Sequence, residues 1–193
     1  GVTYGAVVAP GTTVERRTVG AWSSTTDYGH SATVQQENPV YPVGTDLENR
    51  SAYFSAATPV LNGTHRASYD ADSGDVQAQT TLSLVVRAVD DASGTTYWSQ
   101  TDRLGRETAE LSPGDTVAVP FSVNVTALRH RIGRIESALG TAGETQVLVR
   151  AETVYRGTVD GESVNETTVD TFSISPGGEV YHVADDSRET ADH

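Results

Sequence analysis

Short runs of alternating apolar and polar residues recur along most of the chain, and turn-forming residues separate them. In the run from 116 to 123, for example, Val117, Val119, Phe121 and Val123 alternate with other residues. Because successive side chains of a β-strand point to opposite faces, such a run predicts a strand with one buried face. Threonine, valine and serine are abundant, as in strands. The pattern therefore predicts a mainly β protein.

Turn signals divide this pattern into hairpins. We expect one hairpin from residues 12–22 and 28–36 around the polar segment 23–27, and another from 51–60 and 64–69 around Asn62-Gly63. Residues 77–89 form the longest strand candidate, and apolar residues on both faces of its second half indicate a central strand. Further strands are expected at residues 95–101, 116–123, 145–156, 163–175 and 179–183.

One segment has helical rather than strand spacing. Its apolar residues are Val125, Leu128, Ile132, Ile135 and Leu139. Asn124 or Thr126 can cap the start of this helix and Gly140 can end it. The expected fold is an antiparallel two-sheet β-sandwich with one amphipathic α-helix insertion at about residues 124–139.

The two ends of the chain differ from the middle. Residues 1–9 are small and apolar, and they predict either a first strand or the end of a membrane or signal segment. Residues 10–184 form the expected sandwich, and residues 185–193 are an acidic linker or tail.

The charged residues indicate a saline solvent rather than a polyanionic partner. The chain contains no lysine. It has 13 arginines and 26 acidic residues, which gives a net charge of −13. In molar salt the Debye length falls to about 3 Å, and lysine's apolar stem favours association as salting-out strengthens. This composition predicts a protein of an extreme halophile and argues against nucleic acid as a partner. With no cysteine, disulfides and thiolate metal sites are excluded.

Four Asn-x-Ser/Thr motifs indicate an exported chain with possible N-glycosylation at Asn49, Asn62, Asn124 and Asn165. Asn124 has a structural alternative as the helix cap.

We find no catalytic signature and expect neither a cofactor nor a metal. The Asp-rich segment 70–75 resembles the start of a calcium loop, but its glycine comes one place early, so an acidic hairpin turn is the preferred interpretation. The pairs Glu107 with Glu110 and Glu152 with Glu162 could supply glycosidase carboxylates, but solvated strand faces are the preferred interpretation. The five histidines are interpreted as surface or turn residues: His30, His65, His130, His182 and His193. Seven aromatic residues could line a sugar-binding platform or lie in the core, and Trp98 is the candidate for the buried sandwich tryptophan. They are Trp22, Tyr53, Phe54, Tyr97, Trp98, Tyr155 and Phe172.

The order of aromatic and turn residues resembles a known family. The residues that carry the resemblance are Trp22, Tyr28, His30, Tyr41-Pro42, Tyr53-Phe54, Val60-Leu61-Asn62-Gly63, Tyr97-Trp98, Ser112-Pro113-Gly114, the run 121–125, Gly157, Gly161 and Tyr181. In these positions the chain is similar to the haloarchaeal ectodomains of the domain-of-unknown-function 5305 family. The resemblance implies a surface-facing domain flanked by membrane helices, and it implies no reaction.

We therefore expect a non-enzymatic extracellular domain of a membrane-anchored haloarchaeal surface protein, at the outer face of the cell membrane. Its role would be interaction or cell-envelope structure, and its partner another surface protein or envelope component. The membrane would be reached only through flanking segments. An accessory role in secretion or surface-fibre assembly, with strand 2–9 pairing to a neighbouring copy, is the alternative. Carbohydrate binding or hydrolysis ranks below both.

Overall fold

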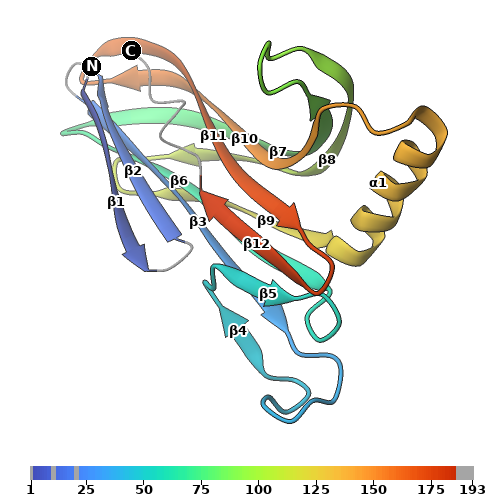
Figure 1. Cartoon of the computed structure of the whole chain (residues 1–193). Helices are drawn as coiled ribbons and strands as arrows, with labels where there is room; N and C mark the ends of the chain where they lie inside the picture. The colour runs from blue at the N-terminus through green and yellow to red at the C-terminus, as the bar shows by residue number, and fades with distance from the viewer. Residues whose placement is uncertain (1, 10–11, 20–21, 186–193) are drawn as a thin grey trace.

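The computed structural model describes residues 2–9, 12–19 and 22–185, which form two antiparallel six-stranded sheets and one helix. The sheets face each other in an open sandwich (Figure 1). This arrangement confirms the predicted mainly β sandwich with a single helix.

In the first sheet the strand order is β1 (Val2–Ala9), β2 (Thr12–Val19), β3 (Trp22–Thr33), β6 (Val60–Asp70) and β9 (Thr116–Asn124). The short strand β4 (Asp46–Glu48) pairs with the end of β3 beyond β2. Residues 2–9 thus form a strand that pairs with β2 of the same chain and ends the sheet.

In the second sheet the order is β5 (Ala52–Phe54), β12 (Val180–Asp185), β11 (Glu162–Pro176), β10 (Glu144–Val159), β7 (Gly74–Val89) and β8 (Thr96–Leu111). The long strand β7 is central, as predicted, but Val85 and Val89 on its outer face are only half-buried. The segment after Asp70 joins β6 of one sheet to β7 of the other, so it is a corner between sheets rather than the predicted hairpin turn.

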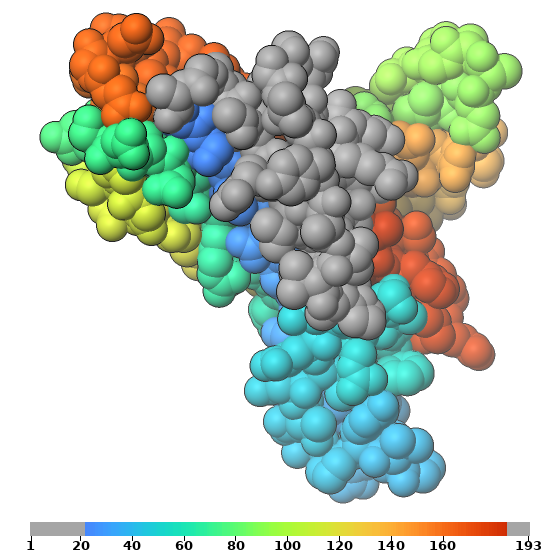
Figure 2. All heavy atoms as spheres, turned by 90° about the vertical axis from the view of Figure 1, so that its left-hand side faces the viewer, coloured from blue at the N-terminus to red at the C-terminus, as the bar shows by residue number. Residues whose placement is uncertain are grey.

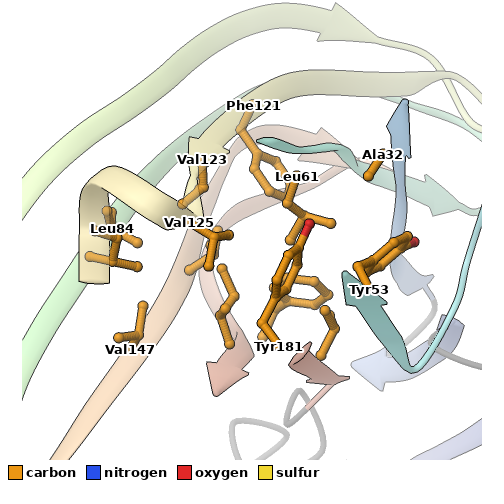
Figure 3. Close-up of a cluster of buried hydrophobic side chains, with 14 of the residues drawn as sticks. Ala32, Tyr53, Leu61, Leu84, Phe121, Val123, Val125, Val147 and Tyr181 are labelled. Atoms are coloured by element: carbon orange, nitrogen blue, oxygen red, sulfur yellow. The ribbon is translucent and has the colours of Figure 1, made fainter. Parts of the chain in front are cut away.

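The core lies between the inner faces of the two sheets. Figure 3 shows Leu61 of β6, Phe121 of β9 and Tyr181 of β12 meeting in its main cluster. A second cluster holds Trp22, whose ring packs edge-on against Tyr69 and Tyr155. Trp98 lies on the edge strand β8 and is only partly buried, so the buried tryptophan is Trp22 and the prediction for Trp98 was wrong.

Two predicted turns are in fact strand interiors. Residues 23–27 lie within β3, and Asn62-Gly63 lies within β6. A Cβ at Gly63 would overlap Cζ of the Phe121 ring. The glycine is therefore needed to make room for the ring of its cross-strand neighbour and not for a positive φ angle.

Helix α1 (Val125–Leu139) confirms the predicted segment. The Asn124 side chain caps it by accepting a hydrogen bond from Ala127 N at 2.9 Å, and Gly140 ends it. Val125, Leu128 and Ile132 are buried, but Leu139 is 69 % exposed. The last turn of the helix therefore extends beyond the sandwich, as Figure 1 shows.

Strands β4 and β5 and their loops project from one end of the sandwich. We call this projection, residues 35–58, the tip. Figures 1 and 2 show it from two directions, coloured blue to cyan. The tip carries the candidate functional site.

Candidate functional site

An apolar groove of about 620 Å³ lies at the tip, where residues 36–41, 54–57 and 178–179 meet. Val40 is 72 % exposed and Phe54 is 43 % exposed. The Tyr41 and Phe54 rings are in contact, with centroids 6.3 Å apart. Exposed apolar groups gathered in one hollow usually mark a binding surface, whereas scattered ones need no explanation.

The turn that carries Phe54 is tightly fixed. Thr58 Oγ1 accepts from Phe54 N at 2.9 Å and donates to Phe54 O at 2.8 Å, while Thr58 N donates to the same carbonyl at 2.7 Å. Tyr181 Oη donates to Thr58 O at 2.6 Å. These bonds fix the backbone that carries Phe54 before any partner binds, which lowers the entropy cost of binding.

Asn38 organises the opposite wall. Its Oδ1 accepts from Val40 N at 2.9 Å and Tyr41 N at 2.7 Å, and its Nδ2 donates to Gln36 O and Tyr41 O. All four bonds lie within one loop. Pro39 follows Asn38 directly and restricts the backbone further. The loop is therefore a preformed wall that presents Val40 outward.

Two buried tyrosines, Tyr53 and Tyr181, lie next to the turn that carries Phe54. The rings of Tyr53 and Tyr181 stack with centroids 5.6 Å apart, and Tyr53 Oη lies 2.7 Å from His30 Nδ1. Burial raises the pKa of Tyr181 to about 12 and also raises the pKa of Tyr53. Both phenols therefore stay neutral across the physiological range and anchor the tip to the sandwich.

Two exposed carboxylates, Glu37 and Glu179, belong to the groove lining. The backbone of Glu179 is joined to the turn that carries Phe54, because Ser55 N donates to Glu179 O at 2.9 Å. An apolar hollow with carboxylates beside it suits an apolar side chain that is accompanied by a cation. The arrangement favours binding.

A second, polar hollow of about 710 Å³ lies over β3, β6 and β9. Gly29, Arg66, Asn49 and Asn62 are among its lining residues. Arg66 makes a long ion pair with Asp27, at 3.9 Å. Burial raises the pKa of Asp27, and the Arg66 charge partly opposes that rise.

The four sequon asparagines differ in their surroundings. Asn62, Asn124 and Asn165 are exposed, and Asn49 is half-buried. The Oδ1 atoms of three of them accept hydrogen bonds: Asn49 from His30 N, Asn62 from Ser122 Oγ and Asn124 from Ala127 N. A glycan attaches at Nδ2, so these acceptor contacts are compatible with modification.

The proposed carboxylate pairs do not form. Glu107 and Glu110 lie on opposite faces of β8, because they are an odd number of residues apart on one strand. Glu162 pairs with Val159, whereas Glu152 pairs with Val169 farther along β10. No group of three or more His, Asp or Glu side chains in the described part of the chain could hold a metal ion.

The candidate aromatic residues divide between core and surface. Tyr53, Tyr155 and Phe172 are fully buried, whereas Phe54 and Tyr97 are exposed. Of these two exposed rings, only Phe54 lines the apolar groove. The tip groove could have been suspected from the sequence, because Val40 and Tyr41 interrupt a polar, proline-marked loop.

Two histidines were wrongly assigned to the surface. His30 is 4 % exposed and His65 is fully buried. His65 Nε2 lies 3.1 Å from Asp170 Oδ2, so the pair joins β6 of one sheet to β11 of the other. His65 Nδ1 has no hydrogen-bond partner among the described residues. His130 and His182 are exposed, and His193 lies outside the described residues.

Comparison with known protein families gives a match over the second half of the chain. The model of a "Family of unknown function (DUF5305)" matches residues 98–193, from β8 to the end of the chain. The match supports the family indicated by the aromatic and turn residues. No curated protein matches the chain. Within the described ranges, no helix has the length and apolar character to cross a membrane.

Proposed function

We propose that this chain, whose second half matches that family of unknown function, is a non-catalytic extracellular domain of a membrane-anchored haloarchaeal surface protein. Its role is interaction at the cell surface or within the cell envelope. The observation that carries the proposal is the preformed apolar groove at the tip. A chain with net charge −13 keeps Val40 and Phe54 exposed together, which is costly for solubility unless a partner covers them.

The composition and the sequons support the cellular location. An acidic surface without lysine suits concentrated salt, and Asn62, Asn124 and Asn165 are accessible to a glycosylating enzyme. Anchoring would come from segments outside this chain, so the full-length protein should sediment with membranes and be released by detergent but not by salt.

Location is testable with a single introduced thiol, because the native chain has no cysteine. Ser93 lies in an exposed turn, so Ser93→Cys in the full-length protein should react with a membrane-impermeant maleimide on intact cells. Thr153→Cys is the matched control, since Thr153 is fully buried and should react only after denaturation. Labelling of Ser93→Cys only after lysis would place the domain inside the cell and refute the proposal.

The interaction role is testable at Phe54. Phe54→Asp in the full-length protein should lower the size of its detergent-solubilised complexes on native gels, because a charge in the groove opposes apolar contact. Tyr97→Asp is the control, since Tyr97 is similarly exposed but lies outside the groove. Complexes of unchanged size in Phe54→Asp would show that the groove binds nothing of consequence. Hydrolysis of envelope polysaccharide by the purified domain would contradict a non-catalytic role.

A further inference from the structure

The groove at the tip has a complement on the same chain, at the free end of α1. The apolar stripe of this helix begins with the buried Val125, Leu128 and Ile132 and continues to Leu139, which is 69 % exposed. An amphipathic helix normally buries its whole stripe. Because the last turn extends past the sandwich, its apolar end has no cover within the described part of the chain.

The same helix is positively charged. It carries Arg129, Arg131 and Arg134 against the single carboxylate Glu136, which gives a net charge of +2 with histidine neutral, in a chain of net charge −13. Arg131 is engaged by Asp102 at 2.7 Å. Arg129 and Arg134 line a shallow surface on the helix together with Ala138. An exposed leucine thus lies on the same helix as two further arginines that are accessible to a partner.

The groove has the opposite character. Its apolar lining includes Val40 and Phe54, and its charged residues are Glu37 and Glu179. The end of α1 cannot reach this groove within one chain, because Figure 1 shows its last turn directed away from the tip. The apolar groove can therefore meet the apolar end of α1, and the groove carboxylates can meet the helix arginines, only when groove and helix belong to two different copies of the chain.

We propose that the groove at the tip binds the C-terminal turn of α1 from a second copy of this chain. Leu139 enters the groove, and Arg129 and Arg134 lie near Glu37 and Glu179. The two surfaces are different patches of one molecule, so the contact is heterologous. Repeated from copy to copy, this contact builds a linear filament. If two copies each place their helix in the other's groove, it forms a closed dimer. The proposal rests on the interaction role of the groove and names its partner.

The test is the mass of the purified chain by sedimentation velocity over a concentration series, at low and at molar salt. The native chain should form dimers or larger assemblies. Glu37→Arg/Glu179→Arg and Arg129→Glu/Arg134→Glu should each weaken association by roughly tenfold or more, because each places like charges together. A 1:1 mixture of the two variants should associate again, since every contact between them regains opposite charges.

Matched controls change the charge equally elsewhere. Arg103→Glu/Arg106→Glu and Glu107→Arg/Glu110→Arg lie on the exposed strand β8 and should associate like the native chain. Leu139→Asp should also disperse the assemblies, while circular dichroism confirms that the variant is folded.

A native chain that stays monomeric at all concentrations overturns the proposal, and so does association that survives the helix variant. Either result leaves the proposed function standing if Phe54→Asp still reduces the complexes solubilised from cells. If Phe54→Asp changes nothing in cells, the interaction role fails as well.

Discussion

Among single residues, Gly63 shows most clearly how packing can require a glycine. A Cβ there would overlap the Phe121 ring and would also lie 2.9 Å from Gly29 O. Overpacking a core typically costs about 1–3 kcal/mol, so we expect Gly63→Ala to lower the free energy of unfolding by about 2 kcal/mol. Denaturant titration measures this change.

A matched glycine serves as the control. Gly133 is exposed on α1, and a Cβ added there would have no heavy atom within 4 Å, so Gly133→Ala should raise stability by up to about 1 kcal/mol. Adding Phe121→Leu to Gly63→Ala should recover part of the loss. Equal effects of the two glycine substitutions would mean that backbone entropy, and not the Phe121 ring, explains Gly63.

Tyr181 sets a limit to stability at high pH. Its folded pKa of about 12 lies above the unfolded value of 10, so the unfolded state ionises first. The contribution is complete below pH 10 and is lost as pH rises from 10 to 12, by roughly 3 kcal/mol in total. Tyr181→Phe should cost about 1 kcal/mol at pH 7, through the lost bond to Thr58, but should lose less stability between pH 10 and 12. Identical pH slopes in the two proteins would contradict this assignment.

Among elements, α1 and strands β7, β10 and β11 follow their sequence patterns closely, whereas β8 extends to Leu111, well past the predicted strand 95–101. The helical spacing and the cap residue placed α1 within one residue of its observed start. The turn between β10 and β11 is tighter than expected: Asp160 and Gly161 form a two-residue connection with φ angles of 49° and 82°. Strands ended less predictably, because pairing with a neighbour extends a strand through residues that locally favour a turn.

The start of α1 allows capping to be separated from glycosylation. Asn124→Ala should destabilise the domain by about 1 kcal/mol, because Ala127 N loses its partner, whereas Asn124→Asp should keep the cap. Both variants remove the sequon. Thr126→Ala removes the sequon alone and leaves the cap, so it should retain the stability of the unglycosylated native chain. Thermal unfolding of the bacterially expressed proteins measures the cap, and a mass shift in the native host reports the glycan.

At the scale of the whole molecule, the pair of His65 and Asp170 ties the two sheets together in the core. Removing one member of a buried pair usually costs about 3–5 kcal/mol, so Asp170→Ala should destabilise the fold by about that amount. Asp102→Ala breaks the exposed pair with Arg131 and should cost less than about 1 kcal/mol. The double variant His65→Leu/Asp170→Leu should recover much of the loss, because no buried polar group is left without a partner. Equilibrium unfolding of all three variants decides the matter, and an Asp170→Ala loss as small as that of Asp102→Ala would show that the pair is unimportant.

The net charge of −13 predicts a salt-dependent fold. Repulsion among the carboxylates destabilises the compact state in dilute buffer, and salt screens it. We expect the Tm to rise by about 5–10 °C between roughly 0.05 M and 2 M KCl, which corresponds to a few kcal/mol for a chain of this size. Sorbitol of equal osmolality should raise the Tm much less. A Tm independent of salt would remove the argument for a saline environment.

Local patterns were enough to predict the mainly β sandwich, its helix and several of its long strands, because alternation and caps act locally. Composition is a sum over the chain, and it predicts a saline solvent. Three features appear only in the folded chain: Gly63 makes room for Phe121, His65 meets Asp170, and Val40 and Phe54 line one groove. The distances between these residues depend on how strands pair within a sheet, how the two sheets pack and how the loops fold. No local pattern encodes them.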